Sequence, residues 1–395
     1  MSVRTTRAVL VAVTAVALSA ALVAPALAAV PAGSGHEATR KAAEAAVGAG
    51  VPGVTVTARD GHGTWSATAG VGNLATGAPR SADDRYRVGS ITKTFVATVL
   101  LQLEAEGRLS LDDSVDKWLP GLVRGNGHDG RQITLRQLLN HTSGIFNYTA
   151  DEGFGRTYFL KDGFFEHRYD TKKPAELVAL AMTHAPDFAP GTSWNYSNTN
   201  YVLAGMVIEK ATGRPYGAEV RDRIIKPLRL TGTSVPGTRV SVPGPSSRAY
   251  SKLAETATGP TYDVTRINPS IAYSAGEMIS DSTDLGRFYT ALLRGKLLPR
   301  KQLAEMTTTV AVDERNGYGL GLMKSELSCG VTVWGHGGGI HGSTSEAVTT
   351  KDGRHSLAFN LNGDWSGDTA AVIEAEFCGT DKAPERTVSR GPDLT

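Results

Sequence analysis

The sequence predicts an α/β protein, with one antiparallel sheet flanked by helices and built from both ends of the chain around a mostly helical insertion. Strand-like runs occur near the N-terminus and again after about residue 270, whereas helical patterns dominate about 108–250. The 395 residues are 41% hydrophobic, which suffices to bury a large core. Both groups of strands need partners, so one shared sheet within a domain of 36–380 is the simplest arrangement.

The first 28 residues have the layout of a secretory signal peptide. Two arginines form a basic start, residues 8–23 are apolar, and Ala-Leu-Ala at 26–28 is a small-residue cleavage site. A membrane anchor is the alternative, but the apolar run is shorter than the ~20 residues that a span needs. We therefore expect a secreted protein with no stable membrane insertion after processing.

The N-terminal part of the expected domain contains a helix, a hairpin and a second helix. Residues 36–47 have a helical pattern, and the strands 54–58 and 64–69 flank the turn at 60–63. Apolar residues then recur at helical spacing over 90–106, which predicts a buried helix of about four turns.

The middle of the chain is predicted to be helical, with long polar loops such as 144–172. The C-terminal part returns to strands joined by a hairpin turn at 351–354, and a last helix spans 370–377. Residues 381–395 are charged and contain Pro and Gly, so we expect a flexible tail. The helical segments are 134–139, 175–184, 199–210 and 216–225, and the strands are 331–334, 344–350 and 356–361.

Charge and cysteine content limit the possible partners. The formal net charge is +2, which is too balanced to indicate nucleic acid as a partner. No His-Glu-x-x-His is present, so the sequence predicts no metal. The two cysteines, Cys329 and Cys378, are expected to form a disulfide in an oxidising compartment, with two buried free thiols as the alternative.

The helix at 90–106 begins with a Ser-x-x-Lys motif, Ser90 and Lys93. Residues three apart share a helix face, so the amine can reach the hydroxyl. A serine needs a neighbour that takes its proton, and a buried lysine can do this. The motif alone is weak, because an N-cap and a surface lysine give the same pattern.

A second motif, Tyr196-Ser197-Asn198, precedes a helix. A phenol beside an ammonium loses its proton more easily, which makes Tyr196 a candidate general base. Asn198 offers an amide to a substrate. Loop packing explains this motif equally well when it is taken alone.

A third motif follows the apolar run 331–334 and consists of His336, Gly337, Gly338 and Gly339. Glycines let a ligand approach the backbone. We expect His336 to bond to the phenol of Tyr196, and the N–H of Gly339 to form an oxyanion hole with that of Ser90.

Taken in order, the three motifs resemble the penicillin-recognising serine hydrolases, that is, DD-peptidases, class C β-lactamases and their esterase and D-aminopeptidase relatives. The similarity covers about 36–380 and is strongest to secreted actinomycete D-alanyl-D-alanine carboxypeptidase/transpeptidases. It extends to 139–144 and to Gly317-Tyr318-Gly319, and the cysteine pair lies where those enzymes are bridged.

The resemblance implies the β-lactamase/transpeptidase-like fold and a role for each motif residue. Ser90 would be acylated, Lys93 and Tyr196 would move the proton, His336 would support Tyr196, and Asn198 with the glycines 337–339 would bind substrate. It implies cell-wall peptides or other small acyl substrates, reaction with β-lactams, no cofactor and a monomer.

Two departures weaken the match to a carboxypeptidase. Those enzymes hold the substrate carboxylate with an arginine thirteen residues before the histidine and with threonines after it. Here these positions are Met323, Gly337 and Gly339. A thioether cannot replace a bidentate arginine, and Lys324 should point to the other face of a strand.

Three functions therefore remain. The first is a D-alanyl-D-alanine carboxypeptidase/transpeptidase acting on peptidoglycan peptides. The second is a β-lactamase-related esterase, β-lactamase or D-amino-acid amidase/peptidase, which Met323 and the glycines favour. The third is a non-catalytic β-lactam or wall-peptide binding protein, which the complete set of catalytic residues disfavours. The sequence contains no Gly-x-Ser-x-Gly elbow, which disfavours an α/β-hydrolase.

Overall fold

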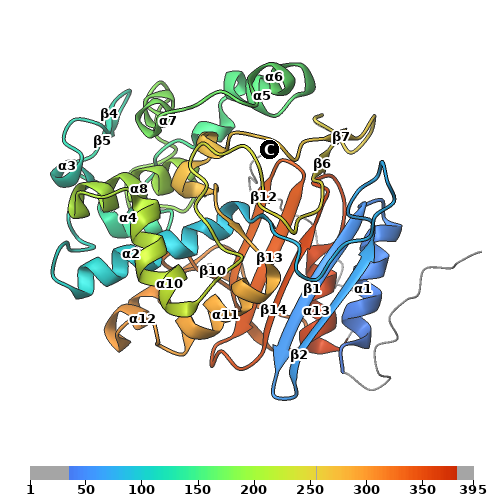
Figure 1. Ribbon diagram of the computed structural model, residues 1–395. Helices are drawn as coiled ribbons and strands as arrows, with labels where there is room; N and C mark the ends of the chain where they lie inside the picture. Colours follow the sequence, from blue (N-terminus) through green and yellow to red (C-terminus); the bar gives the residue numbers. More distant parts are fainter. Residues whose placement is uncertain (1–34, 255, 380–395) are drawn as a thin grey trace, which may run out of the picture. The chain divides into compact units, whose positions relative to one another are not determined.

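The computed structural model describes residues 35–254 and 256–379 (Figure 1). The predicted signal peptide at 1–28 and the tail at 381–395 lie outside the described residues. Among the helices of the described ranges, none combines the length and the apolar character that crossing a membrane would require.

The described residues contain one large antiparallel sheet built from both ends of the chain, as predicted. The strand order is β2-β1-β14-β13-β12-β11-β10-β9. The N-terminal strand β1 pairs with the C-terminal strand β14, with Val54 opposite Leu361. The strands are β1 (Gly53–Asp60), β2 (Gly63–Gly70), β9 (Val310–Ala311), β10 (Asn316–Tyr318), β11 (Met323–Glu326), β12 (Thr332–Ile340), β13 (Ser343–Thr350) and β14 (Ser356–Leu361).

Helices cover both faces of this sheet, which explains why its central strands are buried on both sides (Figure 1). The helices α1 (Glu37–Gly48) and α13 (Thr369–Cys378) pack on one face through alanines and valines. The other face packs against α2 (Thr92–Ala105) and α11 (Ser282–Leu293). The central strands β12, β13 and β14 therefore carry apolar residues toward two separate cores.

The helix α2 lies at the centre of the larger core. Its apolar side chains are almost fully buried, and Phe95 stacks on Phe288 of α11 with ring centroids 3.7 Å apart. The predicted helix started at residue 90, but the structure has a 3₁₀ turn, η1 (Gly89–Ile91), before α2 begins at Thr92. Ser90 thus sits in a tight turn that the core helix anchors.

The helical region corrects one prediction. The segment 144–172, predicted as loop, contains α5 and α6, because Asp151 caps α5 and the apolar side chains of Phe154 and Phe164 are buried. The helices are α3 (Val115–Trp118), α4 (Leu135–Leu139), α5 (Glu152–Tyr158), α6 (Lys161–His167), α7 (Pro174–Ala181), α8 (Asn198–Thr212), α9 (Tyr216–Val220) and α10 (Lys226–Leu228), with a π-helical turn at Arg221–Ile225.

The C-terminal part corrects a second prediction, because two helices interrupt the strands expected after residue 270. Asp281 caps α11 by accepting a hydrogen bond from the backbone N–H of Asp284. The helix α12 (Arg300–Met306) follows. The remaining short elements are β3 (Tyr86–Arg87), β4 (Arg124–Gly125), β5 (His128–Asp129), β6 (Tyr250–Ser251), β7 (Tyr262–Asp263), β8 (Ile279–Ser280), η2 (Tyr148–Ala150), η4 (Pro269–Ile271) and η5 (Tyr273–Ala275).

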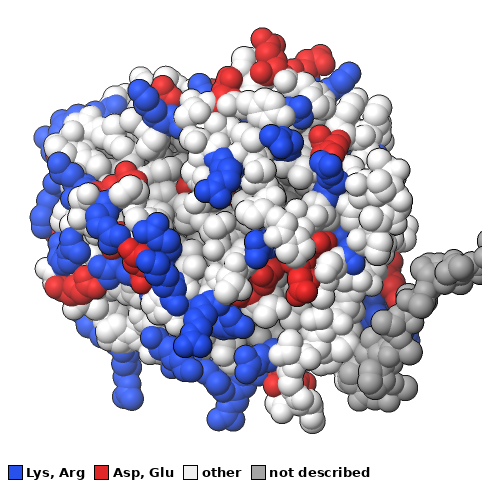
Figure 2. Space-filling view, in the orientation of Figure 1, with Lys and Arg blue, Asp and Glu red and all other residues white. Residues whose placement is uncertain are grey.

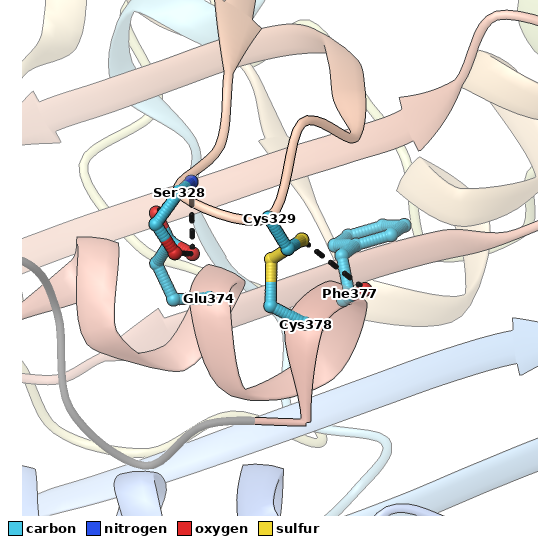
Figure 3. The surroundings of a disulfide bond; sticks show 5 residues. All are labelled: Ser328, Cys329, Glu374, Phe377 and Cys378. Atoms are coloured by element: carbon cyan, nitrogen blue, oxygen red, sulfur yellow. Dashed lines mark hydrogen bonds between the residues drawn. A yellow bond between two sulfur atoms is a disulfide. The ribbon is translucent and has the colours of Figure 1, made fainter.

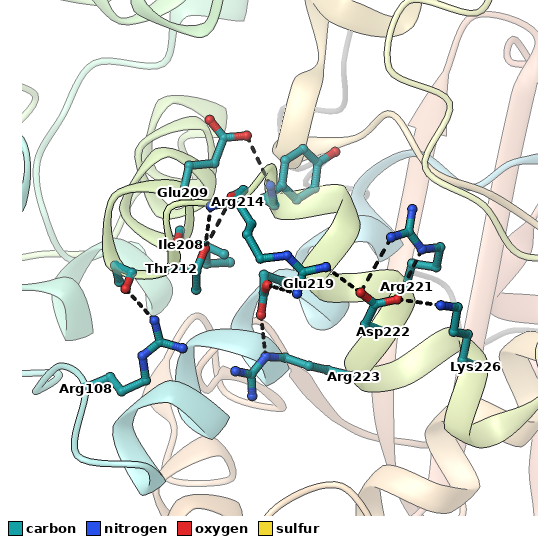
Figure 4. Close-up of polar contacts among 12 residues, drawn as sticks. Arg108, Ile208, Glu209, Thr212, Arg214, Glu219, Arg221, Asp222, Arg223 and Lys226 are labelled. Carbon is teal, nitrogen blue, oxygen red and sulfur yellow. Dashed lines mark hydrogen bonds and ion pairs between the residues drawn. The ribbon is translucent and has the colours of Figure 1, made fainter.

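Ion pairs fasten the helices α8–α10 to one another (Figure 4). Arg214 donates to Glu219 at 2.7 Å and also pairs with Asp222. Arg223 donates to Glu219 at 2.6 Å and contacts Glu106 just beyond the end of α2. Lys and Arg gather over α10 and α11 in Figure 2, with acidic side chains between them. The buried carboxylate of Glu219 accepts from both arginines, and this network ties the helical region to α2.

The predicted disulfide is confirmed. Cys329, in the turn between β11 and β12, is bonded to Cys378 at the end of α13 (Figure 3). Beside it, the backbone N–H of Ser328 donates to Glu374 at 3.0 Å. Closing a loop with a sequence separation of 49 residues stabilises the fold by about 4 kcal/mol in the chain-entropy model.

Candidate active site

A cavity of about 1070 Å³ lies beside Ser90. It is lined by residues of β11, β12 and β13, by residues of α5, by 251–254, 256 and 257, and by the start of α13. Tyr196, His336 and Gly337–Gly339 are part of this lining. The predicted motifs, which are far apart in the sequence, therefore meet at one cavity.

The turn that holds Ser90 is pressed against β12. Gly89 has φ +52°, and a Cβ at this position would lie 2.6–2.9 Å from backbone atoms of Gly339. A Cβ at Gly338 would lie 2.0 Å from the carbonyl oxygen of Val88 and 2.9 Å from the nitrogen of Ser90. Only glycines allow this approach. It brings the backbone of Gly339 next to Ser90, as the expected oxyanion hole requires.

Lys93 lies one turn behind Ser90 and is fully buried. Its Nζ donates to Ser90 Oγ at 2.8 Å, to Asn198 Oδ1 at 2.7 Å and to the carbonyl oxygen of Ala275 at 2.8 Å. These three acceptors match the three N–H donors of an ammonium. The predicted Ser90–Lys93 contact is therefore present, and it holds the hydroxyl in place.

Tyr196 lies on the segment that leads into α8. Its ring centroid is 4.8 Å from Lys93 Nζ and 4.3 Å from the ring of the buried His141. His141 Nδ1 accepts from the backbone N–H of Ser197 and from Asn200 Nδ2. Burial, with a further effect of Lys93, holds the pKa of His141 well below its ordinary value. A neutral histidine thus shapes the loop that positions Tyr196.

The structure gives His336 two hydrogen-bond partners, and the predicted bond between His336 and Tyr196 stays a prediction. Its Nδ1 lies 2.5 Å from the carbonyl oxygen of Gly337 and must donate to it. Its Nε2 then accepts from the hydroxyl of Tyr318 at 2.9 Å. Burial, followed by the charge of Lys93, lowers the pKa of His336 to about 3. The phenol bonded to this neutral ring belongs to Tyr318, while the rings of Tyr196 and His336 lie 6.3 Å apart.

The strand that carries His336 is longer than predicted. β12 continues to Ile340, because Gly337–Gly339 pair with Glu346–Thr344 of β13. The glycines therefore form regular sheet rather than a turn after the strand. Their role in binding substrate stays a prediction.

Asn198 lies behind the lysine. Its side chain is fully buried, with Oδ1 accepting from Lys93 and Nδ2 donating to Thr149 Oγ1 at 3.1 Å. Its backbone N–H donates to Asn147 Oδ1 at 3.0 Å. These contacts orient Lys93, and the predicted contact with a substrate amide stays a prediction.

Met323 and its neighbour Lys324 lie on opposite faces of β11, as predicted. Met323 pairs with Gly335 and lines the cavity, whereas its neighbour Lys324 pairs with Trp334 and is not part of the lining. A cation at 324 thus does not replace an arginine at 323.

Sequence reasoning missed several residues of the site. Tyr318 had appeared only in a stretch of family resemblance, and no pattern indicated that it would bond to His336. Thr149 and Asn147 come from a segment predicted as loop. Glu346 lines the cavity and lies in a correctly predicted strand. It was missed because the sequence did not show that this strand pairs with 335–339, which places Glu346 opposite Gly337.

The cavity wall is acidic. Six of its lining residues are carboxylates and two are Lys or Arg. The carboxylates are Asp151, Glu152, Asp313, Glu346, Asp364 and Glu374, and the cations are Arg156 and Lys252. Burial raises the pKa of Asp364 to about 6, so this group carries only part of a charge near neutral pH. The excess of acidic groups favours a neutral or cationic substrate over an anionic one.

Comparison with known proteins agrees with this geometry. A family model described as "Beta-lactamase" matches residues 39–374. The chain is 66% identical to a D-stereospecific amidohydrolase from Streptomyces sp. of known structure, over 87% of this chain and 99% of that one, with a TM-score of 0.84. It is 29% identical to the D-amino acid amidase of Ochrobactrum anthropi SV3 complexed with D-phenylalanine, over 84% and 92% of the two chains, with a TM-score of 0.72.

A further relative is penicillin-binding protein 4* of Bacillus subtilis (strain 168). The two sequences are 27% identical over 78% of this chain and 68% of the relative. The mixed α/β fold with its large antiparallel sheet is thus shared with hydrolases and with penicillin-binding proteins.

Proposed function

The chain belongs to the beta-lactamase family of penicillin-recognising serine hydrolases, and we propose that it hydrolyses amides and esters of D-amino acids through an acyl-enzyme at Ser90. The observation that carries the choice of substrate is the acidic cavity wall, in which Met323 occupies the position of a cationic clamp. The similarity to the D-stereospecific amidohydrolase supports the D configuration.

The proposed reaction has two steps. Ser90 Oγ bonds to the substrate carbonyl carbon, its proton passes to the Lys93–Tyr196 pair, and the oxyanion receives hydrogen bonds from the backbone N–H groups of Ser90 and Gly339. The bond to the leaving nitrogen or oxygen then breaks, and the leaving group takes that proton. Water attacks the acyl-serine, which releases the acid and restores the hydroxyl.

Lys93 and Tyr196 divide the proton transfer in this proposal. The three acceptors around Nζ match a lysine that stays an ammonium, which favours the ionised phenol of the nearby Tyr196. Tyr196, which lines the cavity, then accepts the serine proton and returns it to the leaving group.

A D-alanyl-D-alanine carboxypeptidase is the second candidate, and the similarity to penicillin-binding protein 4* favours it. Such a substrate ends in a carboxylate. Met323 offers that carboxylate no positive charge to bind, and the carboxylate of Glu346 in the cavity wall would repel it. β-Lactams acylate the serine in either case, and we expect them to label Ser90.

Export is also part of the proposal. The disulfide between Cys329 and Cys378 is typical of proteins that mature in an oxidising compartment. Together with the signal-peptide pattern at 1–28, it supports a protein that acts outside the cytoplasm.

A substrate panel tests the function. Hydrolysis of D-phenylalanine methyl ester and D-phenylalaninamide is compared with their L enantiomers, and with D-alanine release from a diacyl peptide ending in D-Ala-D-Ala. We expect the D-aminoacyl compounds to react and the peptide to react much more slowly. Efficient D-alanine release with little turnover of D-phenylalanine compounds would reject the proposal in favour of the carboxypeptidase.

A further inference from the structure

The cavity that contains Ser90 also has an apolar part, on the face of the sheet that α13 covers. We call this part the α13 lobe. Its lining comes from β11, β12 and β13, from the turn after β11 and from the start of α13. The apolar residues of the α13 lobe are Met323, Leu327, Val333, Val348, Ala370 and Ile373.

Strand pairing leaves a gap in this face of the sheet. Gly335 pairs with Met323 on one side and with Val348 on the other. Directly paired residues point to the same face, so two apolar side chains flank a position that has none. A Cβ at Gly335 would lie 1.9 Å from the carbonyl oxygen of Ala347, so only a glycine fits there.

The start of α13 forms the opposite wall of the α13 lobe. Leu327, Val333 and Val348 belong to one buried apolar cluster, against which Ile373 packs. Ile373 and its neighbour Ala370 are themselves only half-buried, and both line the cavity. An apolar group of a ligand that covered them would remove this surface from water, which is favourable.

The buried carboxylate of the α13 lobe is already bonded. Glu374 accepts from the backbone N–H of Ser328 at 3.0 Å and from its hydroxyl at 2.7 Å (Figure 3). This carboxylate therefore holds the turn after β11 in place and needs no polar group of a ligand.

The α13 lobe lies at the leaving-group end of the site. Gly339 abuts the turn that holds Ser90, so the reacting carbonyl belongs there. His336, three residues earlier, lies beside Tyr196, the proposed proton donor to the leaving group. Gly335 is the next residue along the strand and belongs to the floor of the lobe. The leaving group of a bound substrate therefore extends toward the α13 lobe.

No strand of the described ranges blocks this path. The ladder between β11 and β12 ends at Met323 and Gly335, and His336–Gly339 have no strand partner on that side. An extended substrate can lie along such an edge. Met323, at the end of the ladder, is half-buried. Its flexible thioether suits an apolar chain that turns from the edge onto the sheet face.

We propose that the α13 lobe binds an apolar substituent of the leaving group, which makes amides of long alkyl amines the preferred substrates. This inference rests on the proposed amidase function and adds the chemical class of the leaving group. The C–N bond breaks, the nitrogen takes the proton held by Tyr196, and the free alkylamine departs. Water then supplies the hydroxyl of the released acid.

Three amides of D-phenylalanine test the inference. The N-methylamide and the N-hexylamide contain similar amines, and the N-(5-aminopentyl)amide matches the hexylamide in size but ends in an ammonium. We expect kcat/KM of the native protein to favour the hexylamide over the methylamide by at least about tenfold, which corresponds to burial of two added methylene groups. The ammonium compound should react more slowly than the hexylamide, because its charge would have to enter an apolar lobe.

Two variants locate the alkyl chain. Ala370→Leu fills the α13 lobe, so the hexylamide-to-methylamide ratio should fall close to one. Ile373→Thr keeps the shape of the wall but makes it polar, and should lower the same ratio by about threefold or more. Ala371→Leu is the matched control, because Ala371 is half-buried on the same helix but is not part of the cavity lining. A ratio measured on one protein does not depend on how much of it is folded.

The outcomes separate the inference from the function on which it rests. Equal hydrolysis of the methylamide and hexylamide by the native protein would overturn the inference alone. A preference for the ammonium compound, or a ratio that Ala370→Leu leaves unchanged, would do the same. Failure to hydrolyse any D-aminoacyl ester or amide would overturn the proposed function and, with it, the inference.

Discussion

The two faces of β12 differ in what they leave exposed. On one face, Trp334 and His336 are buried, and His336 is fastened to Tyr318. On the other, Gly337 has no side chain and faces the carboxylate of Glu346, while Met323 lies beside Gly335. The first face holds groups of the catalytic chemistry in place, and the second shapes the space that a substrate fills. Substitutions on the first should slow all substrates, and those on the second should change which substrates react.

The largest effect is expected at the nucleophile. Ser90→Ala removes the group that forms the acyl-enzyme, so kcat/KM for D-phenylalanine methyl ester should fall by at least about 10⁴-fold. Mass spectrometry should find a penicillin adduct on the native protein and none on the variant. Ser325 is a serine of the same cavity wall, on β11. The control variant Ser325→Ala should keep both the ester hydrolysis and the penicillin adduct. An adduct that persists in Ser90→Ala would contradict the mechanism.

The next effect tests which phenol moves the proton. Tyr196→Phe should lower kcat by about 10²–10⁴-fold for all substrates, since a general acid–base group is lost. Tyr318→Phe removes the hydroxyl bonded to His336 and should lower kcat by only about tenfold. We would measure kcat of both variants for ester and for amide hydrolysis. The larger loss identifies the phenol that transfers the proton, and the smaller loss identifies the one that only supports His336. If Tyr318→Phe were the more damaging change, His336 and Tyr318 would be the proton-transfer pair.

The third prediction concerns the second face. Met323→Arg introduces the cation that a terminal carboxylate needs, but Glu346 should attract the new guanidinium, so D-alanine release should rise only slightly. Met323→Arg combined with Glu346→Gln should raise it by about tenfold more. Lys324→Arg lies on the opposite face of β11 and is the control. Equal rates in the single and double variants would show that Glu346 does not oppose a carboxylate.

The smallest effect is a pH dependence of stability. The pKa of His336 is about 3 in the folded chain and about 6.5 when unfolded, so the unfolded chain binds the extra proton between these values. Protonation of His336 in the unfolded chain therefore lowers the free energy of unfolding as pH falls from about 6.5, by up to about 1.4 kcal/mol per pH unit.

The measurement compares urea unfolding of the native protein and of His336→Asn between pH 7 and pH 4. Burial also lowers the pKa of His341, to about 4, and that effect is common to both proteins. The difference between the two curves isolates His336, and a difference that does not change with pH would refute its burial as a neutral ring.

Much of the fold was predictable because its signals are local. The helix at 36–47 and the hairpin around 60–63 follow from periodicity and turn residues, and both are confirmed. The helix α5 was missed because a seven-residue segment with few apolar residues resembles a polar loop. The helix α11 has an amphipathic pattern, but it lies in a part of the chain where strands were expected. Their stability comes from side chains such as Phe154 and Phe288, which are buried only after the chain has folded.

Local spacing also determined the chemistry at Ser90 and Lys93, because they are three positions apart and one turn of backbone brings their side chains together. Tertiary structure alone decided the partner of His336 and the place of Glu346. Tyr318 and Glu346 reach the site through pairing between strands, and a shift of one residue in that register would turn each side chain to the other face. Register depends on the whole sheet, and no single segment encodes it.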